Sequence, residues 1–231
     1  CGGESLLATS YDSFDGVVRK YGEAAESNVK ALVDAGAVVQ HGVDATQLEE
    51  TLLADVVVEE VHFMHPLIDA GDSDRLARSG IIACNSDVII QNRLLVLRFL
   101  RSAQKLLARP IGEIKVTVKD VYPYSWWRVG RLAEFAPPLR LKRVECFVLE
   151  SFPGYVSRTV DRDGILPVES ASSYVFGHLD ETEDDGAPAA ASSSTIKDAV
   201  FFCDTCDKTF TSDGDRSRHL GNRKHNARSH L

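Results

Sequence analysis

Four residues near the end of the chain have the spacing of a tetrahedral metal site. Two residues separate the paired cysteines, twelve separate the second cysteine from the first histidine, and five separate the two histidines. Cysteine thiolates and imidazole nitrogens are the ligands that zinc prefers in structural sites. We therefore predict that Zn²⁺ is bound by Cys203, Cys206, His219 and His225.

The segment that carries these ligands has very few apolar residues of its own. Phe202, Phe210 and Leu220 are the candidates for its small core, so the metal has to supply most of the folding energy. The cysteines suit a turn between two short strands, and the histidines suit successive turns of a helix, which predicts a ββα zinc finger. A redox-active pair of cysteines or a fortuitous spacing are the alternatives.

This segment resembles the matrin-like and double-stranded-RNA-binding zinc fingers. The resemblance rests on the wide spacing of the histidines, on FFCDTCDKTFTS at 201–212 and on HLGNRKH at 219–225. Those fingers usually carry a leucine where this chain has Arg216. The whole chain has a net charge of −8, yet no acidic residue occurs from Arg216 onward. We predict contact with double-stranded RNA, with a solvated basic tail as the alternative. The basic residues involved are Arg216, Arg218, Arg223, Lys224 and Arg228.

Length and composition predict one full domain and one small additional unit. The chain has 231 residues, of which 44% are hydrophobic and 26% are charged. We expect a main domain at residues 1–178, a flexible acidic and Ala/Ser-rich linker at 179–197, and the finger at 198–231. No apolar run reaches the length of a membrane span, and the three cysteines outside the finger are scattered, which favours a reducing compartment and no membrane partner.

Hydrophobic periodicity predicts alternating strands and helices in the main domain. Strands are expected at residues 5–10, 37–41, 56–63, 113–119 and 139–149, and helices at 14–35, 46–53, 91–107 and 126–135. Residues 64–86 show no clear period and are expected to form a long loop. This alternation predicts an α/β domain with a parallel sheet and crossover helices, with an unspecific α+β domain as the alternative.

Acidic residues follow the first two predicted strands. Asp12 follows the first strand and Asp44 follows the second. Ligands of doubly wound sheets bind outside the carboxyl ends of the strands, so one acid is a candidate for ribose hydroxyls and the other for an adenine amine. Such residues also serve as turn or helix-cap residues, which is the alternative.

A series of short motifs occurs in the main domain: ATSYDS at 8–13, KY at 20–21, Asn28, HGVDAT at 41–46, GEIKVTVK at 112–119, PYSWW at 123–127 and FPGY at 152–155. In this order they resemble the Rossmann-like domain of the eukaryotic ribosomal RNA uridine-N3 methyltransferases over residues 5–164. The resemblance implies S-adenosylmethionine as methyl donor and ribosomal RNA as substrate. It also implies a location in the nucleus or nucleolus, with the cytoplasm as the alternative.

The resemblance also sets an expectation for the start of the domain. The family begins with a strand and a glycine-rich loop that cradles the cofactor, and this sequence begins after that loop, at Cys1. We therefore expect an N-terminally truncated Rossmann-like domain, with an open groove in the sheet and weak binding of S-adenosylmethionine.

Two residues are candidates for the chemistry. Methylation of the uridine imide needs a base or a group that stabilises the developing anion. After the strand that corresponds to the one predicted here at 56–63, the family has Asn-Phe-Pro-His. This chain has Met-His-Pro-Leu there, at 64–67. His65 is the candidate base and Lys119 the candidate anion-stabilising residue, with a purely structural role as the alternative for each. Trp126 and Trp127 are candidates to stack on a base, with at least one of them expected in the core.

Two functions follow from these observations. The first is an enzyme that methylates ribosomal RNA at uridine N3, of which this chain is a fragment, with a zinc finger that contacts RNA. The second is a non-catalytic zinc-finger RNA-binding protein with a degenerate methyltransferase fold. The ordered motifs favour the first, and the altered residues at 64–67 favour the second.

Overall fold

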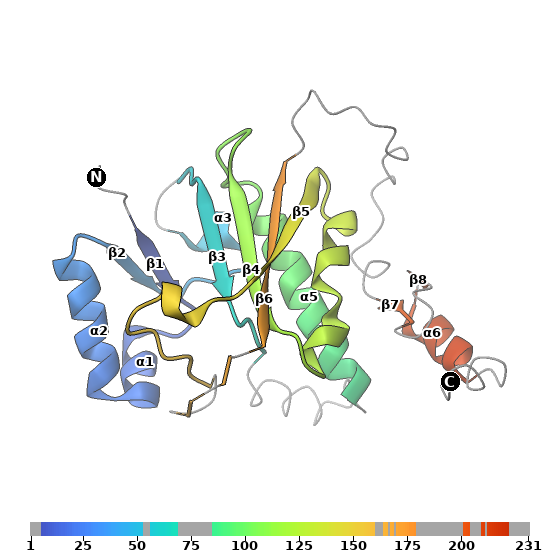
Figure 1. Ribbon diagram of the computed structural model, residues 1–231, viewed down its shortest axis with the longest axis horizontal. Coiled ribbons are helices and arrows are strands. Elements are labelled where there is room, and N and C mark those ends of the chain that lie inside the picture. The colour runs from blue at the N-terminus through green and yellow to red at the C-terminus, as the bar shows by residue number, and fades with distance from the viewer. Residues whose placement is uncertain are drawn as a thin grey trace.

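The chain forms a mixed α/β structure, as its sequence predicted. A computed structural model describes residues 6–52, 56–68, 85–159, 164, 165, 167, 168, 170–178, 201–203, 209, 210 and 212–221. The strands are β1 (Leu7–Ser10), β2 (Val38–His41), β3 (Glu60–Met64), β4 (Glu113–Lys119), β5 (Leu139–Cys146), β6 (Ala171–His178), β7 (Phe201–Phe202) and β8 (Thr209–Phe210). The α-helices are α1 (Phe14–Tyr21), α2 (Glu23–Asp34), α3 (Leu48–Thr51), α5 (Asn85–Ala103) and α6 (Asp213–Leu220) (Figure 1).

The main strands form two sheets. In the first sheet β1 and β2 run parallel, and the second sheet has the order β3-β4-β6-β5. Strands β3 and β4 are parallel, whereas β6 is antiparallel to both of its neighbours, so the prediction of a parallel sheet holds for only part of the domain. The sequence did not predict β6, because serine and glycine interrupt the apolar residues of its segment and lower its strand propensity.

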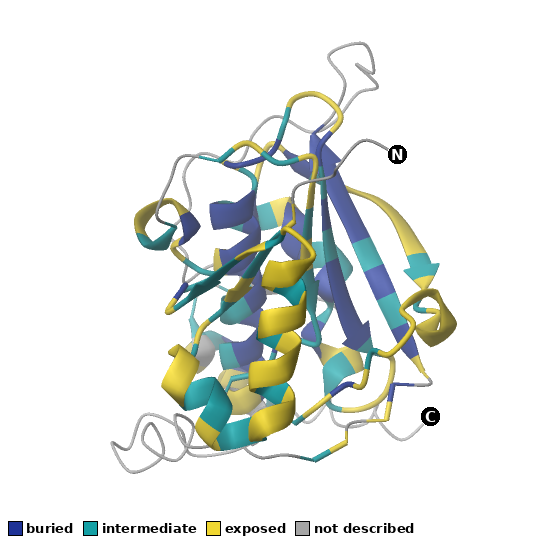
Figure 2. Cartoon of the chain, turned by 90° about the vertical axis from the view of Figure 1, so that its left-hand side faces the viewer, coloured by how far each residue is buried: buried dark blue, intermediate teal, exposed yellow. Residues whose placement is uncertain are grey.

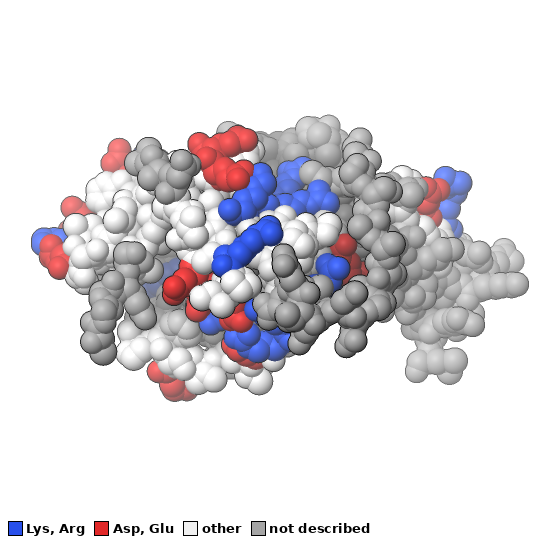
Figure 3. All heavy atoms as spheres, turned by 90° about the horizontal axis from the view of Figure 1, so that it is seen from above, with Lys and Arg blue, Asp and Glu red and all other residues white. Residues whose placement is uncertain are grey.

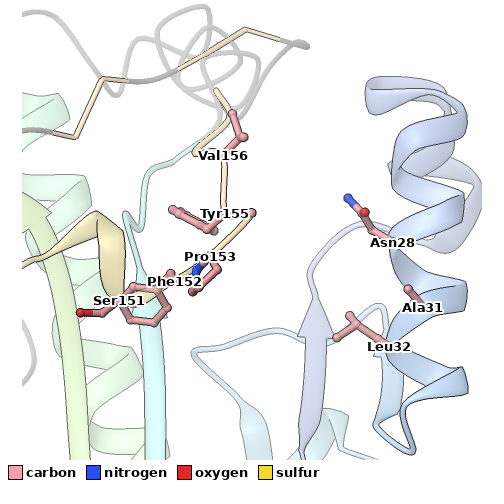
Figure 4. Close-up of a pocket in the computed structure, with 9 residues that line it drawn as sticks. Asn28, Ala31, Leu32, Ser151, Phe152, Pro153, Tyr155 and Val156 are labelled. Carbon is pink, nitrogen blue, oxygen red and sulfur yellow. The ribbon is translucent and has the colours of Figure 1, made fainter.

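An open position separates the two sheets. Among the described residues, β1 pairs with β2 alone and β3 pairs with β4 alone, and β1 lies beside β3 in Figures 1 and 4. Both strands therefore present one edge whose backbone groups are not part of a strand ladder. The expectation of a missing strand at this place stays a prediction.

The hydrophobic core lies between the four-stranded sheet and α5. Val96, Leu97 and Leu100 of α5 are fully buried, as are Ile114 and Val116 of β4. In contrast, α1 and α2 contain no buried residue, and Figure 2 shows them in the colours of exposed and intermediate residues. The stabilising burial therefore belongs mainly to the second sheet, and the β1–β2 unit with its two helices is weakly packed.

Two predicted helices are broken by a residue with a positive φ angle. The helix expected at 14–35 divides into α1 and α2 at Gly22, whose φ of 69° is easily adopted only without a side chain. The helix expected at 126–135 is two 3₁₀ segments, η1 (Tyr124–Trp127) and η2 (Val129–Phe135), divided by Arg128 with φ 52°. These breaks turn the chain where a helical period would have continued.

Three further boundaries differ from the expected ones. Strand β3 begins at Glu60 instead of 56, and helix α5 spans Asn85–Ala103 instead of 91–107. Val58 forms an isolated parallel bridge with Leu107 outside both elements, which accounts for the late start of β3 and the early end of α5. Strand β5 ends at Cys146 instead of 149 and is followed by the short segment η3 (Leu149–Ser151).

The short helix expected at 46–53 is α3 (Leu48–Thr51), and Thr46 does not cap it, because its amide and hydroxyl donate to Asp44 instead.

The predicted loop at 64–86 lies largely outside the described residues, and the predicted linker at 179–197 lies entirely outside them. Within the part of the chain that is described, no helix combines the length and apolarity needed to cross a bilayer.

Candidate functional site

The carboxyl ends of β1 and β2 lie together, since Ser10 is in register with His41. The Ser10 hydroxyl is 2.7 Å from Nδ1 of His41, which fixes the two strand ends to each other. Asp12 follows directly, and both of its carboxylate oxygens accept hydrogen bonds from Nζ of Lys20, at 3.1 and 2.9 Å. Asp12 is therefore at the expected edge of the sheet and is held in an ion pair within the chain.

Asp44 follows β2 at the same edge and folds back on its own turn. Its Oδ1 accepts hydrogen bonds from the amide of Thr46 at 2.8 Å and from the hydroxyl of Thr46 at 2.7 Å. This is the turn role that was the alternative in the sequence analysis. The contacts among described residues all go to Oδ1, so Oδ2 is the atom of Asp44 that can accept a hydrogen bond from a ligand.

His65 follows β3 and turns the chain out of the sheet. Its φ of 50° lies in the left-handed region, which non-glycine residues seldom adopt, and its amide donates to the carbonyl of Thr117 at 2.8 Å. Both ring nitrogens are buried and have no hydrogen-bond partner among the described residues. An unsatisfied buried imidazole on strained backbone is a feature that structures more often keep for function than for stability.

Lys119 ends β4, the parallel neighbour of β3, so the structure brings the two predicted catalytic residues to adjacent strand ends. Burial lowers the pKa of His65, and the positive charge of Lys119 lowers it further. The Lys119 ammonium also lies 6.0 Å from the ring centroid of Tyr124, within the range of a cation–π contact. A neutral imidazole beside a cation can accept a proton while the cation stabilises nearby negative charge.

Lowered histidine pKa values predict a loss of stability in acid. Burial and cations lower the pKa of both His65, near Lys119, and His178, near Arg109 and Lys142. The unfolded chain then binds more protons than the folded chain below the ordinary imidazole pKa of about 6.5. We expect the free energy of unfolding, followed by tryptophan fluorescence, to fall as pH drops from 7.5 to 5.

The variants His65→Gln and His178→Gln should each flatten that pH dependence, and the double variant should flatten it most. Each substitution removes one titrating ring and keeps a polar side chain of similar size. An unchanged pH dependence in the double variant would contradict the prediction.

An aromatic cluster that the sequence analysis did not identify lies next to His65. The ring of Phe147 meets His65 edge-on at 5.6 Å and 84°, and stacks on Phe152 at 5.3 Å and 19°. Tyr155 completes the cluster at 6.3 Å from Phe152. The FPGY motif marked two of these residues, but no local signal connects a residue at 147 with one at 65.

The loop at residues 151–156, which carries Phe152 and Tyr155, also lines an open groove of about 770 Å³. In Figure 4, Asn28 and Leu32 of α2 face the loop that carries Phe152 and Tyr155, across the space beside β1 and β3. None of the four predicted cofactor and catalytic residues lines this groove. A hydrogen bond of 3.0 Å from the Tyr21 hydroxyl to the carbonyl of Thr159 also links α1 to this part of the chain.

A protein-family match includes the strand ends of β1 and β2 and those of β3 and β4. The family model described as BMT5-like, rRNA (uridine-N3-)-methyltransferase BTM5-like, matches residues 1–159. This chain belongs to the BMT5-like family. The matched range contains Asp12, Asp44, His65 and Lys119, so all four candidate residues lie in the BMT5-like part, whereas β6 and the C-terminal segment follow it.

Two curated relatives, both from Arabidopsis thaliana, are similar to this chain. Heavy metal-associated isoprenylated plant protein 41 is 36% identical over 163 residues, which cover 68% of this chain and 28% of that relative. An uncharacterized protein is 29% identical over 177 residues, which cover 74% of this chain and 80% of that relative. The chain thus spans little more than a quarter of the first relative and most of the second.

Beyond the BMT5-like match, the C-terminal segment has the order β7, β8, α6, with β7 and β8 antiparallel and Ser212 capping α6. Cys203 is buried, and the ring of His219 lies 4.9 Å from that of Phe210. Cys206 and His225 lie outside the described residues. The described ranges contain no group of three or more His, Cys, Asp or Glu side chains that could hold a metal ion, and they include two of the four predicted ligands.

The predicted basic patch of this segment needs one correction. Arg216 is only 5% exposed, so its side chain packs inward on α6 and contributes little to the charged surface. Arg218 is exposed, and it forms an ion pair with Asp215 at 2.6 Å. The remaining basic residues, Arg223, Lys224 and Arg228, lie outside the described residues.

Several basic residues on the α/β unit form ion pairs with acids. Figure 3 shows the molecule from above, with Lys and Arg gathered near the centre and Asp and Glu beside them. Arg143 bridges Glu113 at 2.7 Å and Glu145 at 2.5 Å, and Lys105 bridges Glu49 at 2.5 Å. Pairing of this kind lowers the net field that a surface offers to a polyanion.

Proposed function

We propose that this chain acts in the S-adenosylmethionine-dependent methylation of ribosomal RNA at uridine N3. Membership of the BMT5-like family carries the proposal, since the family model covers residues 1–159. The placement of His65 and Lys119 at adjacent strand ends supports it, because this reaction needs a proton acceptor beside an anion-stabilising charge. With ribosomal RNA as substrate, we also propose the nucleus or nucleolus as the site of action.

The chain's own residues divide the chemistry between them. S-adenosylmethionine, when bound, supplies an already activated methyl group. His65, kept neutral by burial and by Lys119, accepts the N3 proton of uridine at a ring nitrogen. Lys119 stabilises the negative charge that develops on the uracil ring.

The two acids are the residues that would hold the cofactor. Oδ2 of Asp44 suits an amine donor such as that of adenine, because the turn uses only Oδ1. Asp12 keeps lone pairs for ribose hydroxyls beside its bonds to Lys20. The donor set therefore fits the nucleoside part of the cofactor.

The C-terminal segment is proposed to be a zinc finger that contacts RNA. Its ββα order, the burial of Cys203 and the position of His219 on α6 support a site completed by Cys206 and His225. The RNA contact is assigned to Arg218, Arg223, Lys224 and Arg228. The buried Arg216 is left out.

One observation favours the non-catalytic alternative. Lys20 pairs with both carboxylate oxygens of Asp12, and Asp44 is engaged by its own turn, so both acids have partners within the chain. A protein that had lost cofactor binding could keep these contacts for stability and still bind RNA through its finger.

Nucleoside analysis of the product distinguishes the two functions. The protein is incubated with ribosomal RNA and S-adenosylmethionine carrying a deuterated methyl group, and the digested RNA is examined by mass spectrometry. Deuterated N3-methyluridine supports the enzyme. Tight RNA binding without any methylated nucleoside, together with no heat of binding when the cofactor is titrated by calorimetry, supports the alternative.

The basic end of the finger is expected to contribute phosphate contacts. The double substitution Arg223→Ala plus Lys224→Ala should weaken binding of duplex RNA and reduce the salt dependence of log K by roughly one unit per lost phosphate contact. Titrations at several salt concentrations measure both quantities. Arg98→Ala plus Lys105→Ala, which removes equal charge from α5 and the turn after it, is the matched control. Equal affinity and salt slope in all three proteins would show that the finger's charges do not contact RNA.

A further inference from the structure

Two large aromatic side chains are exposed together just beyond the end of β4. Tyr122 is 57% exposed and Trp126 is 44% exposed. Their ring centroids lie 5.1 Å apart, and their planes are nearly perpendicular, at 87°. The two rings therefore form a corner, in which a flat molecule that stacks on one ring meets the other ring edge-on.

The backbone under this corner is held rigidly. Trp127 is 1% exposed and belongs to the core, so of the two tryptophans only the first faces solvent. Arg93, which is fully buried in α5, donates hydrogen bonds from Nε at 3.1 Å and from Nη2 to the carbonyl of Trp126. The amide of Trp126 in turn donates to the carbonyl of Pro123 at 3.1 Å. A surface fixed in this way loses little conformational entropy when a ligand binds.

The corner belongs to the same end of the sheet as the predicted catalytic residues. Tyr122 follows Lys119 by three residues, and Tyr124, between the two exposed rings in sequence, lies under the Lys119 ammonium. Residues 119–128 contain two basic residues, Lys119 and Arg128, and one acidic residue, Asp120, and the next basic residue, Arg131, forms an ion pair with Glu134 at 3.5 Å. An anionic, partly unpaired strand that reaches His65 therefore passes a locally basic surface that carries exposed rings.

We propose that Tyr122 and Trp126 form a stacking site for an unpaired RNA base that lies next to the reacting uridine. The choice of RNA rests on the proposed function. N3 of uridine is covered by pairing in a duplex, so the strand at the site has to be unpaired, and its unstacked bases need new partners. Aromatic side chains provide them without regard to sequence.

Tryptophan fluorescence tests this proposal in the intact protein. The chain has two tryptophans, and the buried Trp127 is shielded from stacking, so quenching reports on Trp126. The probes are a single-stranded oligouridylate and a ribose–phosphate strand of equal length that lacks bases. The variants are Trp126→Ala, Tyr122→Ala and Trp126→Phe, with Ile111→Ala as control, because Ile111 is exposed at the opposite end of β4.

Oligouridylate is expected to quench the fluorescence of the wild-type protein, and Trp126→Ala should weaken its binding roughly 5- to 150-fold, measured by anisotropy of a labelled strand. Trp126→Phe should keep most of the affinity, and Ile111→Ala all of it. The salt dependence should stay the same in every variant, because stacking neutralises no phosphate. Without bases, the strand should bind wild type and Trp126→Ala equally weakly.

Any of three results would overturn the stacking site: no quenching at saturation, equal affinity of wild type and Trp126→Ala, or equally tight binding of the strand without bases. A protein partner for this corner would give the first two. Because no methyl donor is present, the outcome is independent of catalysis. Stacking without methylation would refute the proposed function alone, and methylation without stacking would refute this inference alone.

Discussion

Replacing Cys206 with serine is expected to abolish zinc binding by the C-terminal segment and to unfold it. A structural zinc site of two cysteines and two histidines contributes about 10–16 kcal/mol of apparent folding free energy at neutral pH. The described part of the segment has a two-residue strand pair and one short helix, which is too little apolar burial to replace that contribution. Metal analysis should find one zinc per wild-type chain and none in Cys206→Ser.

Cys146→Ser is the matched control, because Cys146 is an exposed cysteine on β5, outside the segment. It should keep its zinc. The tryptophan fluorescence of both variants should stay native, since both tryptophans belong to the α/β unit. A Cys206→Ser protein that retains stoichiometric zinc, or a wild-type protein that keeps its α6 helix after complete chelation, would show that the segment is not a zinc finger.

Substitution of His65 by glutamine is expected to slow methyl transfer by roughly 10²- to 10⁴-fold, the usual contribution of a positioned general base. The reason is geometric, since the ring nitrogens have no hydrogen-bond partner among the described residues, and His65 follows β3 and lies beside the charge of Lys119. RNA affinity should change little. The wild-type rate should rise with pH through a pKa below that of a free imidazole, and this acidic limb should vanish in His65→Gln.

His62→Gln is the control for that experiment, because His62 is an exposed histidine on the same strand. Lys119→Met should reduce the rate by roughly 10²- to 10³-fold, as expected when one stabilising charge is lost from a reaction site. A His65→Gln enzyme of wild-type rate would assign the strained histidine to structure alone. An acidic limb that persists in the variant would assign the proton transfer to another group.

Local periodicity predicted the elements with a single strong pattern. Ile114, Val116 and Val118 alternate along 113–119, and β4 has those bounds. The pattern failed where a single residue has a positive φ angle that ends a helix. Gly22 and Arg128 are such residues, and the apolar period of the sequence continues across both of them. It also failed for β6, which is buried between two antiparallel neighbours although its sequence is rich in serine.

The candidate site was predictable only in part, because its contacts join distant segments. The family resemblance and the strand ends indicated Asp12, Asp44, His65 and Lys119, and the structure places them in two pairs at strand ends. The partners of these residues did not follow from the sequence. Phe147, which directly follows β5, contacts His65 from a distant part of the sequence, and no local pattern encodes that contact.

The open position between β1 and β3 has a consequence for how reaction distance is set. The residues proposed to hold the cofactor belong to the β1–β2 sheet, and the residues proposed to move the proton belong to the β3–β4 pair. Among the described residues no strand ladder joins these two bodies, and contacts of other kinds connect them: Leu48, soon after Asp44, is buried in the core and its amide donates to Oγ of Ser102 at 2.7 Å, and the Tyr21 hydroxyl donates to the carbonyl of Thr159. The separation of the proposed methyl donor and acceptor is therefore set by side-chain packing between the two bodies, and not by the backbone hydrogen bonds of one sheet, so the alignment on which the rate depends rests on that packing.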